Sequence, residues 1–141
     1  MNLGTYLEEK KGNAVNKISK DKTIKECAET LNSKRIGALV VTDDKDNLEG
    51  IVSERDILRK GLLKLDKSVA EIMTPKSKLI TVDASANIID VMKKFDENKI
   101  RHMPVLENEK VIGVISIGDV IHGLLEINLA ENDQLKKYIF G

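Results

Sequence analysis

The stretch Gly50-Ile51-Val52-Ser53-Glu54-Arg55-Asp56-Ile57 decides the fold, because a related stretch follows it 63 residues later. The second version is Gly113-Val114-Ile115-Ser116-Ile117-Gly118-Asp119-Val120. In both, an apolar, β-branched run leads into Ser-x-x-Asp, a pattern typical of a strand that is followed at once by a helix. Self-similarity of this kind predicts that one structural unit has been duplicated in tandem.

The residues upstream keep the same repeat. Asp21-Lys22-Thr23 and Asp83-Ala84-Ser85 each precede a helical pattern, at an offset of 62 residues. Within each pattern, apolar residues recur at i, i+3, i+4 and i+7, which predicts a helix with one apolar stripe. These residues are Ile24, Cys27, Ala28 and Leu31 in the first copy and Ile88, Val91, Met92 and Phe95 in the second.

Each helical pattern is followed by two β-rich runs that a polar turn separates, which predicts a hairpin. The predicted fold class is α/β (α+β), with two tandem β-α-β-β-α units that form a pseudo-twofold pair. Pairing is expected because one such unit has too few helices to cover its sheet, so sheet packs against sheet. The predicted strands are 17–19, 38–41 and 48–52 in the first copy and 79–81, 103–106 and 111–115 in the second.

The repeat also predicts how the chain is divided. We expect an N-terminal helical turn over 1–12, a first unit over 13–67, a second unit over 68–125 and a C-terminal helical tail over 126–141. Thr74-Pro75 punctuates the chain near the junction, because proline disfavours helix in the residue before it. The apolar residues of the tail fit either packing on their own domain or self-association, and both readings stay open.

Composition narrows the class of protein. Of 141 residues, 41% are hydrophobic and 33% charged, which is typical of a soluble globular chain. No apolar run reaches the ~20 residues of a membrane span, and the first twelve residues lack a secretory signal, so we expect a cytoplasmic protein without a membrane partner. The 23 basic and 23 acidic residues balance, which argues against nucleic acid as a partner.

Metal binding and catalysis are not expected either. Cys27 is the single cysteine and only His102 and His122 accompany it, so no zinc-type ligand set is present. Cys27 lies on an apolar helical stripe and is expected in the core. Neither copy offers a nucleophile with an acid and a base, and the chain lacks a Gly-x-x-x-x-Gly-Lys phosphate loop, so we expect no enzyme and no catalytic cofactor.

Two interpretations of Ser-x-x-Asp stay open. A serine at the start of a helix with an acidic residue three positions later is a capping box, which satisfies free helix amides and needs no ligand. The same two side chains suit a nucleotide, because the hydroxyl can donate to a phosphate and the carboxylate can accept from a ribose. Arg55 and the pair Arg101-His102 could supply cations for the phosphate.

Taken together, these stretches resemble the pair of cystathionine-β-synthase (CBS) domains that is called a Bateman module. The resemblance covers about residues 12–125. Its matching stretches are Arg35-Ile36-Gly37-Ala38-Leu39-Val40-Val41, Gly50 to Ile57, Val69-Ala70-Glu71-Ile72-Met73-Thr74, Ile100-Arg101-His102-Met103-Pro104-Val105 and Gly113 to Val120. It implies a regulatory, signal-transducing module with two equivalent clefts for AMP, ADP, ATP, NAD or S-adenosylmethionine, with AMP favoured, and commonly a homodimer.

The resemblance also implies which residues line each cleft. In the first cleft, Asp119 would take the ribose, Val114 would lie against the base, and Arg101 and His102 beside the phosphates. The first cleft comprises Asn16, Ile36, Gly37, Arg101, His102, Val114, Ser116, Gly118 and Asp119, and the second comprises Ile51, Ser53, Arg55, Asp56, Lys78 and Thr81.

The two copies are not fully symmetric. Gly118 stands where the first copy has Arg55, and Ile36-Gly37 stand where the second has Arg101-His102. Equal occupancy of the clefts is therefore not expected. The alternative function is a scaffold that binds no ligand and dimerises or docks on an unidentified enzyme or transporter.

Overall fold

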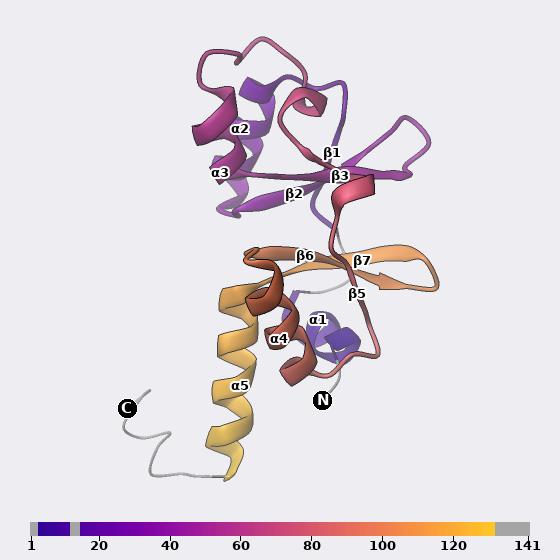
Figure 1. Ribbon diagram of the computed structural model, residues 1–141, viewed down its shortest axis with the longest axis vertical. Coiled ribbons are helices and arrows are strands. Elements are labelled where there is room, and N and C mark those ends of the chain that lie inside the picture. Colours follow the sequence, from indigo (N-terminus) through magenta and orange to yellow (C-terminus); the bar gives the residue numbers. More distant parts are fainter. Residues whose placement is uncertain (1–2, 12–14, 132–141) are drawn as a thin grey trace.

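Two lobes make up the protein, and the computed structural model describes residues 3–11 and 15–131 of it (Figure 1). The first lobe holds a four-stranded sheet of order β1-β2-β3-β4, and the second a three-stranded sheet of order β5-β6-β7. The sheets lie toward the middle of the molecule and the main helices on their outer sides (Figure 1). This mixed α and β architecture with two sheets confirms the predicted fold class.

The first unit follows the expected order of elements. Its strands β1 and β2 are parallel, and β2 and β3 form the predicted antiparallel hairpin. Its elements are β1 (Lys17–Ser19), α2 (Ile24–Lys34), β2 (Ala38–Thr42), β3 (Leu48–Ser53), α3 (Glu54–Asp56) and a π-helical turn, Ile57–Gly61, that continues α3.

The second unit repeats this order with a later first strand. It consists of β5 (Val82–Asp83), α4 (Ile88–Asn98), β6 (His102–Glu107), β7 (Lys110–Ser116) and α5 (Ile117–Glu131). The strand expected at 79–81 begins instead at Val82, since residues 79–81 follow a 3-10 turn over Lys76–Lys78 without forming strand. Of the expected tail over 126–141, the helix α5 includes the part up to Glu131, and 132–141 lie outside the described residues.

Local signals begin and end both long helices. The Thr23 hydroxyl accepts from the Glu26 backbone N–H at 3.1 Å to cap α2, and the Asn87 side chain accepts from the Asp90 N–H at 2.9 Å to cap α4. The residue after each helix is left-handed, Arg35 with φ 53° and Lys99 with φ 52°. The repeat is thus retained even in backbone conformations that a residue other than glycine rarely adopts.

Successive side chains of a strand point to opposite faces of the sheet, so the buried residues form separate layers. Leu39, Val41 and Val52 pack with the helices of the first unit. Their neighbours Val40 and Ile51 are also buried but lie outside that cluster, since they point to the opposite face of the sheet, toward the second unit. Sheet therefore packs toward sheet across the pseudo-twofold seam.

The core of each unit is completed by the segment that precedes the other unit in the sequence. The helix α1 (Leu3–Lys11) packs on the second unit, where Leu3, Tyr6 and Leu7 are buried with Phe95. Its Gly4 N–H donates to the Ala84 carbonyl at 2.9 Å.

Residues 69–75 make the reciprocal contact with the first unit. Val69 and Ile72 lie in its core, and β4 (Thr74–Pro75) pairs with β3. These residues were expected in the second unit, which the repeat places from 68 onward. The sequence repeat locates the two copies of the unit. It does not show on which copy a preceding segment packs. Pro75 is tolerated because β4 lies at the edge of the sheet.

Within the described ranges, no helix combines the length and the apolar character that crossing a membrane requires.

Candidate functional site

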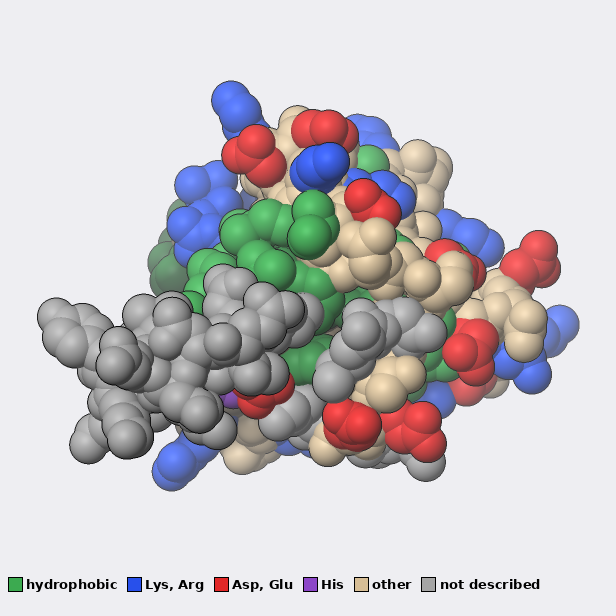
Figure 2. Space-filling model, turned by 90° about the horizontal axis from the view of Figure 1, so that it is seen from below, with side chains coloured by type: hydrophobic (Ala, Val, Ile, Leu, Met, Phe, Trp, Pro, Cys, Tyr) green, Lys and Arg blue, Asp and Glu red, His purple; other side chains and the backbone are tan. Residues whose placement is uncertain are grey.

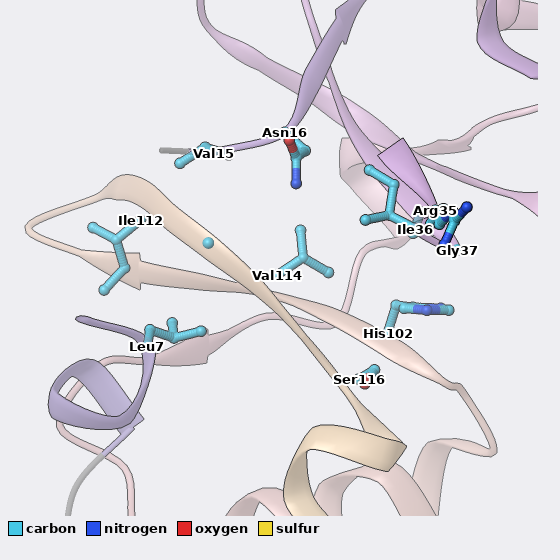
Figure 3. A pocket seen from close by; sticks show the side chains of 12 residues that line it. Leu7, Val15, Asn16, Arg35, Ile36, Gly37, His102, Ile112, Val114 and Ser116 are labelled. Atoms are coloured by element: carbon cyan, nitrogen blue, oxygen red, sulfur yellow. The ribbon is translucent and has the colours of Figure 1, made fainter. Parts of the chain in front are cut away.

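A cavity of about 430 Å³ lies at the seam between the two sheets. Asn16 reaches it from the segment before β1, Ile36 and Gly37 from the turn before β2, and His102, Val114 and Ser116 from β6 and β7. Asn16 and Val114 point toward one another across it (Figure 3). The structure thus brings together six of the nine residues expected in the first cleft.

The other three lie elsewhere. Arg101 lines the second cleft, and neither Gly118 nor Asp119 is among the residues that line either cleft. The half-buried Asp119 carboxylate accepts from the Ser116 backbone N–H at 2.8 Å, and the Ser116 hydroxyl accepts from the Asp119 N–H at 3.0 Å. Asp119 therefore caps α5 in this structure.

The second cleft is a cavity of about 240 Å³. It contains five of the six expected residues, since Thr81 does not line it. Ile51 and Ser53 reach it from β3, and Arg55 and Asp56 from α3. Lys78 contributes from the 3-10 turn of the other unit. Both clefts are therefore built from two units, as a ligand site in the seam requires.

The capping box is formed in the first copy as well. One Asp56 oxygen, Oδ2, accepts from the Ser53 N–H at 2.9 Å and from the Ser53 hydroxyl at 3.2 Å. The other, Oδ1, lies 4.0 Å from Lys60 Nζ. A carboxylate has about four acceptor positions, so capping leaves Asp56 able to accept from a ligand in the cleft. The two interpretations of Ser-x-x-Asp are compatible at this residue.

His102 lines both cavities and thus lies where they meet. A Cβ at Gly37 would stand 3.3 Å from His102 Nε2 and 3.7 Å from Glu54 Oε1. Glycine at position 37 therefore lets the imidazole approach the backbone just before β2 closely.

Cys27 takes no part in either cleft and is fully buried in the first core. Burial raises the pKa of its thiol to about 11, with the Asp56 charge as a smaller cause. The side chain is a core residue, as its place on the helical stripe predicts.

Several residues that line the two clefts were not predicted from the sequence. Leu7, Val15 and Ile112 line the first cleft, and Leu79, Ile80, Lys99 and Ile100 line the second. The repeat held a usable signal, because Arg35-Ile36-Gly37 in the first cleft correspond to Lys99-Ile100-Arg101 in the second. The structure corrects the sequence alignment of Ile36-Gly37 with Arg101-His102 by one residue, because the Gly37 and Arg101 carbonyls accept from the equivalent N–H groups of Glu54 and Ile117. Gly37 therefore corresponds to Arg101, which lines the second cleft. Leu7 had no such signal, because its place depends on where α1 packs.

The fold and these clefts define a class of protein. The sequence profile of the CBS domain matches residues 14–62 and again 69–126. The chain therefore belongs to the CBS-domain family, as two tandem copies, and the resemblance seen in the sequence is confirmed. CBS pairs of this kind are regulatory modules.

Individual relatives agree with that assignment. The chain is 35% identical over 127 residues to the mitochondrial CBS domain-containing protein CBSX3 of Arabidopsis thaliana, covering 86% of this chain and 62% of that protein. A CBS-domain protein from Agrobacterium tumefaciens has a crystal structure with 33% identity and a TM-score of 0.78, covering 87% of this chain and 98% of its own. CBSX2 of Arabidopsis thaliana, solved in complex with AMP, has 26% identity and a TM-score of 0.74, with 90% and 98% covered.

Proposed function

We propose that this protein is a ligand-sensing regulatory module that binds an adenine nucleotide in the clefts between its CBS units. AMP is favoured, and ADP, ATP, NAD and S-adenosylmethionine are the other candidates. The observation that carries the proposal is the convergence of Asn16, Ile36, Val114 and Ser116 from both units on one cavity of about 430 Å³. That volume lies in the usual range of small-molecule sites, roughly 300 to 1,000 Å³. The AMP complex of CBSX2 supports the choice of ligand.

The lining residues suggest how such a ligand is held. Ile36 and Val114 provide aliphatic walls for the adenine, and the Ser116 hydroxyl and Asn16 amide provide polar contacts for the sugar and phosphate. Because one ligand touches both units, it favours the arrangement of the units that it fits best. The module responds to its ligand by a change of shape or of dimer packing, without catalysis.

A homodimer is part of this proposal. Leu58 is 67% exposed and Ile121 is 45% exposed, although both are large apolar side chains. They occupy equivalent places, five residues after Ser53 and Ser116, and the helices that carry them lie on the same side of the two lobes (Figure 1). Seen from below, hydrophobic side chains also gather into one area among charged ones (Figure 2). A second copy of the chain would cover such a surface in the cytoplasm.

Titration of the protein with AMP, followed by its melting temperature, tests the function. A ligand that binds only the folded state must raise the melting temperature with its concentration. Val114→Trp fills the first cleft and is expected to abolish most of the AMP-dependent rise. Lys110→Trp places the same ring on an exposed position of the same strand, and the rise is expected to remain.

One outcome would reject the ligand-sensing function, and another would reject only the placement of the ligand in the first cleft. One is an unchanged melting temperature with every adenine compound at millimolar concentration, which would favour the docking scaffold. The other is an equal rise in Val114→Trp and the unsubstituted protein, which would move the ligand out of the first cleft.

A further inference from the structure

The two clefts differ in the number of cations that line them and, by one unit, in net charge. Arg55, Lys78, Lys99 and Arg101 all line the second cleft, together with the acidic Glu54 and Asp56. Among the described residues that line the first cleft, Arg35 is the one side chain with a permanent positive charge. An anion with several charges therefore meets a more favourable environment in the second cleft.

The four cations of the second cleft form no close ion pairs within the part of the chain that the structure describes. Over residues 3–11 and 15–131, no ion pair within 4.0 Å joins any of them to an acidic side chain. Glu54 and Asp56 flank Arg55 in sequence, but the Oδ2 atom of Asp56 accepts from Ser53 and its Oδ1 atom lies near Lys60. The positive charge of this cleft is thus available to a ligand.

Departures from the repeat are the source of this charge. Arg55 corresponds to Gly118 and Arg101 to Gly37, so two of the four cations have a neutral counterpart. The counterpart Gly37 lines the first cleft. Two otherwise equivalent sites have in this way acquired different charges.

We propose that the second cleft binds the phosphate chain of a nucleoside di- or triphosphate, whereas the first admits adenosine or its monophosphate. The volumes agree with this division, because about 430 Å³ in the first cleft accommodates more of a nucleoside than about 240 Å³ in the second. Lys78, Lys99 and Arg101 are exposed, so a phosphate chain can run outward along them. The adenine part of the inference rests on the proposed function, whereas the phosphate part rests on the charges alone.

Isothermal titration calorimetry without magnesium tests the proposal with adenosine, AMP, ADP, ATP and inorganic tripolyphosphate. The test variant is Lys78→Gln/Arg101→Gln, and the control is Lys64→Gln/Lys93→Gln, which removes the same charge at exposed positions outside both clefts. In the test variant, the affinity for ATP and for tripolyphosphate is expected to fall roughly tenfold, as the sum of two exposed ionic contacts. The affinity for AMP is expected to change less than about twofold, and the control to match the unsubstituted protein.

Salt dependence adds a measurement on the unsubstituted protein. Raising the ionic strength is expected to weaken the binding of ATP and tripolyphosphate more steeply than the binding of AMP, because the first two carry more charge to be screened. The proposal is overturned if tripolyphosphate does not bind, if the test variant keeps full affinity for it, or if AMP and ATP lose affinity equally. If tripolyphosphate binds and no adenine compound does, the proposed function and the adenine part of this inference fail, while the phosphate part stands.

Discussion

His102 is the side chain through which the two clefts touch. It begins β6, lines both cavities and lies against Gly37 across the seam. The first cleft is closed at this point by a residue without a side chain, so the position of the imidazole sets the shape of the cavity. A change as small as one methyl group at residue 37 is therefore expected to alter ligand binding.

Gly37→Ala is expected to push the His102 ring by a few tenths of an ångström, because the new Cβ would stand 3.3 Å from Nε2. The expected cost is roughly 1 kcal/mol of unfolding free energy. AMP affinity is expected to fall about fivefold, which is the equivalent of ~1 kcal/mol. The His102 ring signals in NMR spectra report the displacement, and calorimetry reports the affinity.

Gly118→Ala is the matched control. Its Cβ would meet only the Ser116 hydroxyl, at 3.7 Å, which is ordinary contact. Alanine in place of glycine within α5 is expected to add roughly 0.5 kcal/mol of stability and to leave the His102 signals in place. Unshifted His102 signals in Gly37→Ala would contradict the close approach on which this account of the seam depends.

At the scale of elements, both units have capping residues at their helix starts, but only some of these residues line a cleft. The box at Thr23 begins α2 and lines neither cleft, whereas the box at Ser53 begins α3 and lines the second. The sequence alone predicted the helices, because helical apolar spacing and a capping residue are local signals. It could not separate caps that line a cleft from caps that do not, because that distinction depends on the opposite unit.

Removing each capping hydroxyl in turn distinguishes a role in helix stability from a role in ligand binding. Thr23→Ala and Ser53→Ala are both expected to lower the free energy of unfolding by about 1 kcal/mol, since each leaves a helix amide without its acceptor. Only Ser53→Ala is expected also to weaken ligand binding in the second cleft. Denaturant unfolding and ATP titration of the two variants measure these effects. Equal ATP affinity in both would reduce Ser53 to a purely structural residue.

At the scale of the whole molecule, the exchange of leading segments ties the two units together. The helix α1 covers the second unit and residues 69–75 cover the first, so neither unit has a complete core from its own copy. The hairpins, the long helices and their duplication could be predicted because each follows from short-range pattern. The exchange, and with it Leu7 in the first cleft, could not, since several packings satisfy the same apolar stripe.

The proposed self-association also belongs to this scale. Leu58→Asp/Ile121→Asp is expected to convert a dimer into a monomer, because a charge on each exposed apolar position makes burial against a second copy costly. Sedimentation equilibrium measures the molecular mass directly. Leu63→Asp, which changes a 99% exposed leucine outside the regular helices, is expected to leave the mass unchanged. A protein that is monomeric before substitution would remove the homodimer from the proposed function.

A crystal structure of the protein grown with AMP at saturating concentration tests the central claim most directly. We expect density for the nucleotide in the seam, with adenine between Ile36 and Val114 and the phosphate near Ser116. AMP bound only outside the two clefts, or empty clefts at saturating AMP, would contradict the account.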